Sequence, residues 1–132
     1  MKLNFFLVCD NATIGSEYKP VLFGIFKNIW SSVVPSDDKP LVHPSFVAAF
    51  EISGVDKLGK GEIKLELVFG SANKVLSSQS IPFERKKESP NEIGGLVEFR
   101  QQKLPSLGDY TLNLYLDGET VGSTGFRVAK KT

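Results

Sequence analysis

Cysteine and histidine are almost absent from this 132-residue chain, which holds one of each, Cys9 and His43. A single cysteine cannot close an intrachain disulfide, whereas small secreted domains usually depend on several, so a reducing, cytoplasmic environment is expected. A Ser-His-Asp or Cys-His active site needs a base beside its nucleophile, and a zinc site needs several such ligands. The composition therefore predicts neither a nucleophilic hydrolase nor a zinc protein.

Long apolar runs and an excess of charge of one sign are also lacking. No apolar run is longer than Phe5 to Cys9, which is far shorter than a membrane span and shorter than the apolar part of a signal peptide, so the start is expected to be a strand. The net charge is +1, which gives no overall attraction to nucleic acid or to an anionic membrane. Neither is expected as a partner.

What the sequence does contain is strand patterning, clearest near the C-terminus. Large apolar side chains occupy every second position of residues 110–116, and Asp117-Gly118 follows, a pair that supplies the positive φ angles of a two-residue hairpin turn. With that turn, Phe126 and Val128 would face solvent. A one-residue bulge within residues 122–125 is therefore expected, because it returns both side chains to the core.

Further strand-like segments are separated by turn residues, and no stretch keeps a helical period for three turns. They span residues 3–9, 21–30, 45–53, 62–69, 74–83 and 96–104. With the hairpin, this predicts an all-β fold in a single domain, residues 1–132: a two-sheet antiparallel sandwich, immunoglobulin-like or similar, of about eight strands. Tyr110 sits where such sandwiches often carry a corner tyrosine, although an ordinary core aromatic is the alternative.

Several strand ends and turns, in their order along the chain, resemble a family of short, uncharacterised bacterial and archaeal proteins. They are Cys9-Asp10-x-Ala12, Lys19, Gly24-Ile25-Phe26, Pro44-Ser45-Phe46, Leu116-Asp117-Gly118-Glu119 and Phe126-Arg127-Val128. The resemblance spans most of the chain. It implies a single all-β domain and brings no known activity, cofactor or catalytic residue.

The first two expected strands are apolar on both faces, unlike the residues 62–69 strand, which alternates cleanly. Contiguous exposed aromatic surface is uncommon on a monomer, so either the loop at residues 31–40 or another protein chain must cover the second face. Phe26 and Trp30 are aromatic anchors of the kind enriched in binding hot spots. The candidate partner-binding residues are Phe6, Phe26, Trp30, Val33 and Val34.

These features predict a non-enzymatic protein-interaction or structural module that holds no cofactor and binds a protein partner or itself, as in a homodimer. Activity carried by carboxylates alone needs two acids across one cleft, and no spacing places two together. The alternative is a small-ligand or calcium-binding sandwich that uses loop aspartates. Its candidate ligands are Asp37, Asp38 and Asp109.

Overall fold

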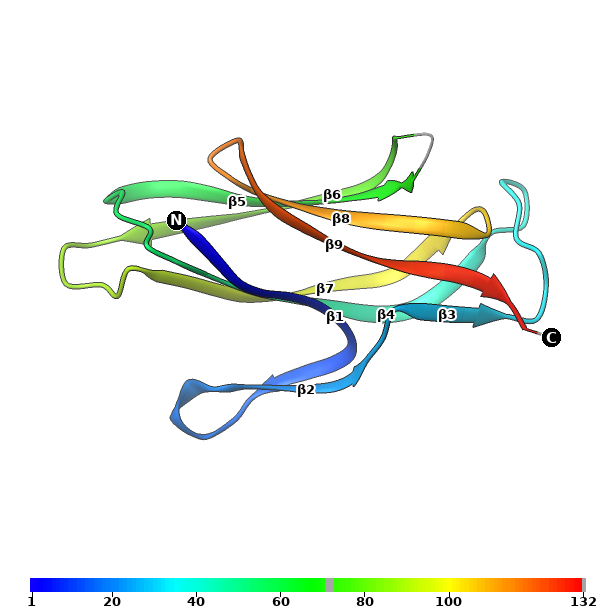
Figure 1. Ribbon diagram of the computed structural model, residues 1–132, viewed down its shortest axis with the longest axis horizontal. Helices are drawn as coiled ribbons and strands as arrows, with labels where there is room; N and C mark the ends of the chain where they lie inside the picture. The colour runs from blue at the N-terminus through cyan, green and yellow to red at the C-terminus, as the bar shows by residue number, and fades with distance from the viewer. Residues whose placement is uncertain (71–72, 132) are drawn as a thin grey trace.

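The computed structural model describes residues 1–70 and 73–131, which form nine strands and one short 3-10 turn (Figure 1). In chain order the elements are β1 (Lys2–Ile14), η1 (Ser16–Tyr18), β2 (Pro20–Ile25), β3 (Asn28–Ser31), β4 (Leu41–Ser53), β5 (Gly59–Phe69), β6 (Lys74–Arg85), β7 (Glu92–Leu104), β8 (Gly108–Leu116) and β9 (Glu119–Lys130). The predicted number of eight is corrected to nine within these residues, because the expected strand at residues 21–30 divides into β2 and β3.

The strands form two curled sheets that pack face to face (Figure 1). The four-stranded sheet has the order β2-β1-β4-β7, and the five-stranded sheet has the order β3-β9-β8-β5-β6. All neighbouring strands are antiparallel except β3 and β9, which run parallel. The predicted all-β, two-sheet architecture is confirmed.

One apolar cluster fills the space between the sheets. Aromatic rings form much of its centre: Phe46 stacks on Phe99 with ring centroids 4.9 Å apart, and Tyr110 stacks on Phe126 at 5.4 Å. Alternation along each strand delivers one side of each sheet to this cluster. Most of the large apolar residues of β4, β5 and β8 are therefore buried in the core.

The β8–β9 hairpin has the predicted turn and nearly the predicted bulge. Asp117 and Gly118 have φ angles of 49° and 84°, and Leu116 pairs with Glu119. The register shifts where Leu114 pairs with Gly122 while Tyr115 pairs with Thr120, so the extra residue is Val121. The bulge lies one residue nearer the turn than expected, and it places Phe126 and Val128 in the core as expected.

A second bulge sets the phase of β1. Leu3 pairs with Ile52 and Phe5 pairs with Glu51, so Asn4 is the extra residue. From this point Phe6 and Val8 face the core, whereas Phe5 and Leu7 face outward. Phe6 is only 7% exposed, so its assignment to a partner-binding surface is wrong: the bulge reverses the alternation from which that assignment came.

Cys9 pairs with both Val47 of β4 and Ile25 of β2, and beyond it β1 leaves β4 and pairs with β2 alone. Residues 10–25, here called the arm, form a hairpin that returns beneath the outer face of the four-stranded sheet (Figure 1). On that face Cys9, Val47 and Ala49 are buried although they lie outside the core cluster. The arm therefore supplies part of the cover that the two-faced strands require, a role that the sequence assigned to the loop at residues 31–40 or to another chain.

Candidate functional site

The chain from residue 20 to residue 34, here called the edge segment, forms a free edge of both sheets. β2 ends the four-stranded sheet and β3 ends the five-stranded sheet. Between them the Phe26 amide donates to the Val8 carbonyl at 3.1 Å, and the Arg127 amide donates to the Lys27 carbonyl at 2.8 Å. One continuous segment thus passes from the first sheet to the second.

The opposite edges of the sheets, β6 and β7, are tied to each other. Gln79 Nε2 on β6 donates to the Glu98 carbonyl on β7 at 2.9 Å, and the Ser77 hydroxyl donates to Gln102 Oε1 at 2.9 Å. β6 also contains Pro82, a residue type that sheets tolerate at their edges because it has no backbone N–H to donate. The edge segment differs from this side in having no comparable bridge between β2 and β3 within the described residues.

The edge segment carries much of the exposed apolar surface. Among the side chains that the structure describes, eleven large apolar ones are exposed, and six of these belong to the edge segment: Val21, Phe23, Ile25, Trp30, Val33 and Val34. Those on β2 occupy alternate positions and so share one face of the strand. Phe23 and Ile25 are 54% and 56% exposed. Between Pro20 and Phe26 this apolar edge has no charged side chain, one of the features that usually protect a sheet edge against pairing with another strand.

Phe26 anchors this segment to the core. Its ring is half-buried, lies edge-on to Phe46 and Phe126 at centroid distances of 6.3 and 5.9 Å, and stacks on His43 at 5.9 Å. The sequence predicted Phe26 as an aromatic anchor for a binding partner, and the structure corrects that role. Phe26 fixes the crossover between the sheets, and its ring is largely used inside the molecule.

Trp30, Val33 and Val34 lie at the surface, where the sequence placed them, and are 64%, 61% and 61% exposed. Trp30 is on β3 beside Ala129 of β9. The buried Ser31 hydroxyl then donates to the Val33 carbonyl at 2.6 Å, which turns the chain out of the strand. The loop at residues 31–40 does not bury its two valines, so these side chains do not cover the apolar face of the first strands.

The loop aspartates have local partners or local roles. Arg127 Nε and Nη2 donate to the two carboxylate oxygens of Asp109 at 2.8 and 3.2 Å, and this pairing lowers the pKa of Asp109. Asp37 and Asp38 lie at the tip of a turn closed by the Ser36 amide on the Lys39 carbonyl. Within residues 1–70 and 73–131, no three His, Cys, Asp or Glu side chains gather as metal ligands would.

Cys9 and His43 are packed into the protein. Burial and the nearby Asp10 charge raise the pKa of the Cys9 thiol, which donates to the Val47 carbonyl at 3.6 Å. A raised pKa keeps the thiol protonated and a poor nucleophile. His43 lies between Phe26 and Phe46, with ring centroids 5.9 Å from each.

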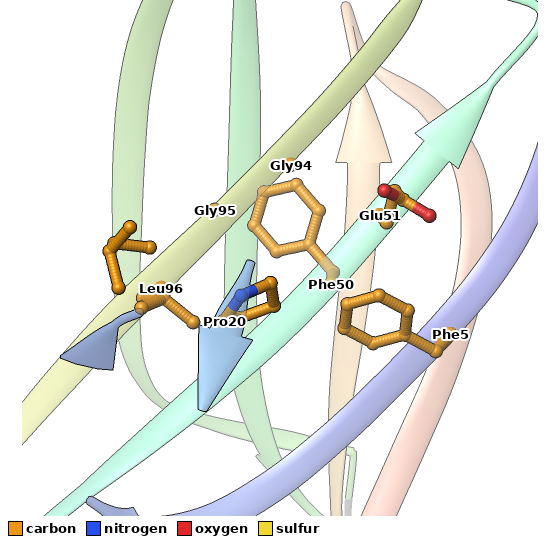
Figure 2. Close-up of a pocket in the computed structure, with 8 residues that line it drawn as sticks. Phe5, Pro20, Phe50, Glu51, Gly94, Gly95 and Leu96 are labelled. Carbon is orange, nitrogen blue, oxygen red and sulfur yellow. The ribbon is translucent and has the colours of Figure 1, made fainter. Parts of the chain in front are cut away.

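A groove that the sequence did not predict lies between the arm and the outer face of the four-stranded sheet. Its volume is about 420 Å³. Phe5, Glu51 and Gly94 lie in one row across β1, β4 and β7, and Pro20 of the arm forms another wall (Figure 2). Ile14, which pairs with Pro20, also lines the groove. No short motif signals this groove, because it arises from the Asn4 bulge and the return of the arm.

The fold and these surfaces define a class: an all-β protein of two packed sheets with an exposed apolar edge. The chain belongs to a family of unknown function, DUF6941, whose match covers residues 4–129. The resemblance noted from the sequence is thereby confirmed in its main point, a domain of unknown function.

No curated protein matches the chain. A crystal structure of a β-glucosidase from Listeria innocua in complex with glucose is similar to it, with a TM-score of 0.47 and 12% identity. That similarity covers 95% of this chain and 16% of the β-glucosidase chain, so this chain spans less than a fifth of that enzyme's length. Over residues 1–70 and 73–131, the protein has no helix of the length and apolarity that crossing a membrane would take.

Proposed function

We propose that this protein is a non-enzymatic interaction module that binds a second copy of its own chain through the edge segment. The carrying observation is the concentration of exposed apolar side chains on β2 and β3, each at the end of a sheet. An edge strand presents unpaired backbone donors and acceptors, and a second strand can satisfy them while it covers the apolar side chains.

A second copy is the preferred partner because an edge strand is complementary to itself. Two β2 strands related by a two-fold axis run antiparallel and can continue one sheet into the next. Phe23 lies near the middle of β2, so its side chain would meet its counterpart close to the axis. Trp30, Val33 and Val34 extend the same apolar surface beyond the crossover at Phe26.

The proposal of a non-enzymatic role is supported by the surroundings of Cys9 and His43, the two residue types in the chain best suited to nucleophilic catalysis. The Cys9 thiol is buried and hydrogen-bonded to a carbonyl, and His43 stacks on Phe26 and lies edge-on to Phe46. Asp109 is held by Arg127. A reducing, cytoplasmic location remains the expectation that accompanies a single buried cysteine.

Sedimentation velocity across a concentration series into the high micromolar range tests the self-association. Wild-type protein should shift from monomer to dimer, and Phe23→Lys should remain monomeric because a charge at the axis meets its own copy. Val75→Lys is the matched control, since Val75 is 50% exposed on β6, the edge of the other sheet. A wild-type protein that stays monomeric throughout, or a Val75→Lys variant that dissociates equally, would overturn the proposal.

We also propose that the sandwich is immunoglobulin-like in topology. β1, β4 and β7 share one sheet and β5, β8 and β9 share the other, which matches the division of strands A, B, E and C, F, G in immunoglobulin domains. In this assignment β8 corresponds to strand F. Tyr110, near its start, bonds back to Ser106 as a corner tyrosine does.

A further inference from the structure

The groove between the arm and the four-stranded sheet has an apolar lining with one charged group, Glu51. Phe5, Pro20 and Leu96 give it apolar walls, and Gly94, directly opposite Glu51 on β7, adds no side chain (Figure 2). A larger residue at that position would fill the space beside the carboxylate. The volume of about 420 Å³ lies within the range of small-molecule sites, roughly 300–1,000 Å³.

The Glu51 carboxylate is held in place by neutral groups. The Ser53 hydroxyl donates to Asn4 Oδ1 at 3.1 Å, which fixes the orientation of the amide, and Asn4 Nδ2 donates to Glu51 Oε2 at 3.0 Å. Asn4 reaches this position because it is the bulged residue of β1. Bulges often re-aim a side chain in this way next to functional sites.

This arrangement orients the carboxylate without neutralising it. None of the ion pairs formed by residues 1–70 and 73–131 includes Glu51. A neutral apolar ligand would desolvate the carboxylate without replacing its lost hydration, and an anion would be repelled by it. A cation on an apolar stem satisfies both the carboxylate and the apolar walls.

We propose that the groove is a binding site for a primary amine carried on an apolar stem. The ammonium group donates to Glu51 beside Gly94, and the stem lies along Phe5, Pro20 and Leu96. Pro20 begins β2, but the exposed side chains of Val21, Phe23 and Ile25 do not line the groove, so the proposal does not depend on self-association.

Titration of n-hexylamine into ¹⁵N-labelled protein, followed by amide chemical shifts, tests the site. Saturable shifts are expected at Phe5, Glu51 and Gly94. Hexan-1-ol has the same stem without the charge and should bind at least about tenfold more weakly, because a hydrogen bond to a charged group exceeds a neutral one by that margin. Shifts that do not saturate, or an alcohol that binds as well as the amine, would refute the site.

Two variants test whether the charge of Glu51 is what the amine requires for binding. Glu51→Gln keeps an acceptor for Asn4 and should weaken hexylamine binding by at least about tenfold while leaving hexanol binding unchanged. Glu98→Gln is the control, because Glu98 lies on β7 paired with Arg100 at 3.0 Å and does not line the groove. Equal loss in both variants, or no loss in Glu51→Gln, contradicts the proposal.

If Glu51→Gln does not fold, the wild-type comparison of amine with alcohol still decides the question. The same titration in the Phe23→Lys background separates the two proposals. Hexylamine binding by this monomeric variant supports the groove independently of the edge segment. A dimer that binds no amine would overturn the groove alone.

Discussion

Tyr110 and Ser106 are joined by two hydrogen bonds. The Tyr110 hydroxyl donates to the Ser106 carbonyl at 2.5 Å, and the Ser106 amide donates to that hydroxyl at 3.0 Å. The tyrosine ring is 1% exposed and stacks on Phe126. One side chain thus ties the β7–β8 connection to the core, because its ring packs between the sheets while its oxygen completes the turn.

Tyr110→Phe should therefore destabilise the protein by about 1–2 kcal/mol, because the ring is retained while a partly buried carbonyl and amide lose their partner. Urea denaturation monitored by circular dichroism gives the free energy of unfolding. Tyr115→Phe is the matched control, since Tyr115 is only half-buried on the outer face of the same strand. Equal effects in the two variants would mean that the Ser106 bonds contribute nothing specific.

The β8–β9 hairpin could be predicted in detail because its information is local. The alternation, the Asp117-Gly118 turn and the need for a bulge all follow from neighbouring residues. The exact position of the bulge does not follow from neighbouring residues. Gly122 lies under Leu3 of β1, whose Cδ2 is 2.5 Å from where a Cβ would stand, so a strand distant in sequence occupies the space beside it.

The first strand shows what local patterning misses. Strict alternation put Phe6 on the outer face, but the bulge at Asn4 exchanges the two faces for the rest of the strand. Likewise, residues 21–30 look like one apolar strand in the sequence. In the structure the chain bends at Gly24, which has a φ of 66°, and crosses at Phe26 from one sheet to the other. The groove and the edge segment both follow from these two irregularities, which only the tertiary structure reveals.

Arg85 begins the basic run Arg85-Lys86-Lys87, yet it is only 6% exposed. Its guanidinium donates to the Val55 carbonyl, to the Lys57 carbonyl at 3.1 Å and to the Pro90 carbonyl at 2.9 Å. Arg85→Met should cost roughly 2–3 kcal/mol, because three carbonyls lose a charged donor that linked the β4–β5 and β6–β7 connections.

Thermal and urea unfolding of Arg85→Met measure this cost. Lys86→Met serves as the control, since Lys86 is the exposed neighbour and its substitution should stay within about 0.5 kcal/mol of wild type. If both variants were equally stable, Arg85 would be a peripheral charge and not a link between two connections.

Asp117 makes stability depend on pH in the acid range. Lys57 Nζ donates to one carboxylate oxygen at 2.8 Å and the Glu62 amide donates to the other at 2.8 Å, so the pKa of Asp117 falls below its ordinary value of 3.8. A carboxyl whose pKa is lower in the folded state contributes stability that is complete above the unfolded value. That contribution is lost as pH falls through the folded value.

Wild-type protein should therefore unfold at a higher temperature than Asp117→Asn at neutral pH, and the difference should shrink below about pH 4. Thermal unfolding at a series of pH values measures it. Lys57→Met should reduce the same pH dependence, and added salt should narrow the difference at neutral pH, because Lys57 is well exposed. A difference that persisted unchanged at pH 2 would exclude the carboxylate as its source.

Truncation of Phe26 and truncation of Trp30, four residues apart on the edge segment, should affect different properties: the first the stability of the monomer and the second its self-association. Phe26→Ala removes a half-buried ring that contacts Phe46, Phe126 and His43, so it should lower the free energy of unfolding by about 2–4 kcal/mol. Trp30→Ala removes a side chain that is 64% exposed and should change the stability of the monomer by no more than about 0.5 kcal/mol. In sedimentation, however, Trp30→Ala should weaken the dimer, since interface aromatics contribute much of the binding free energy.

Denaturation at low protein concentration and sedimentation at high concentration separate the two effects. A Trp30→Ala variant that is destabilised as a monomer yet associates normally would make Trp30 a packing residue and remove it from the interaction surface.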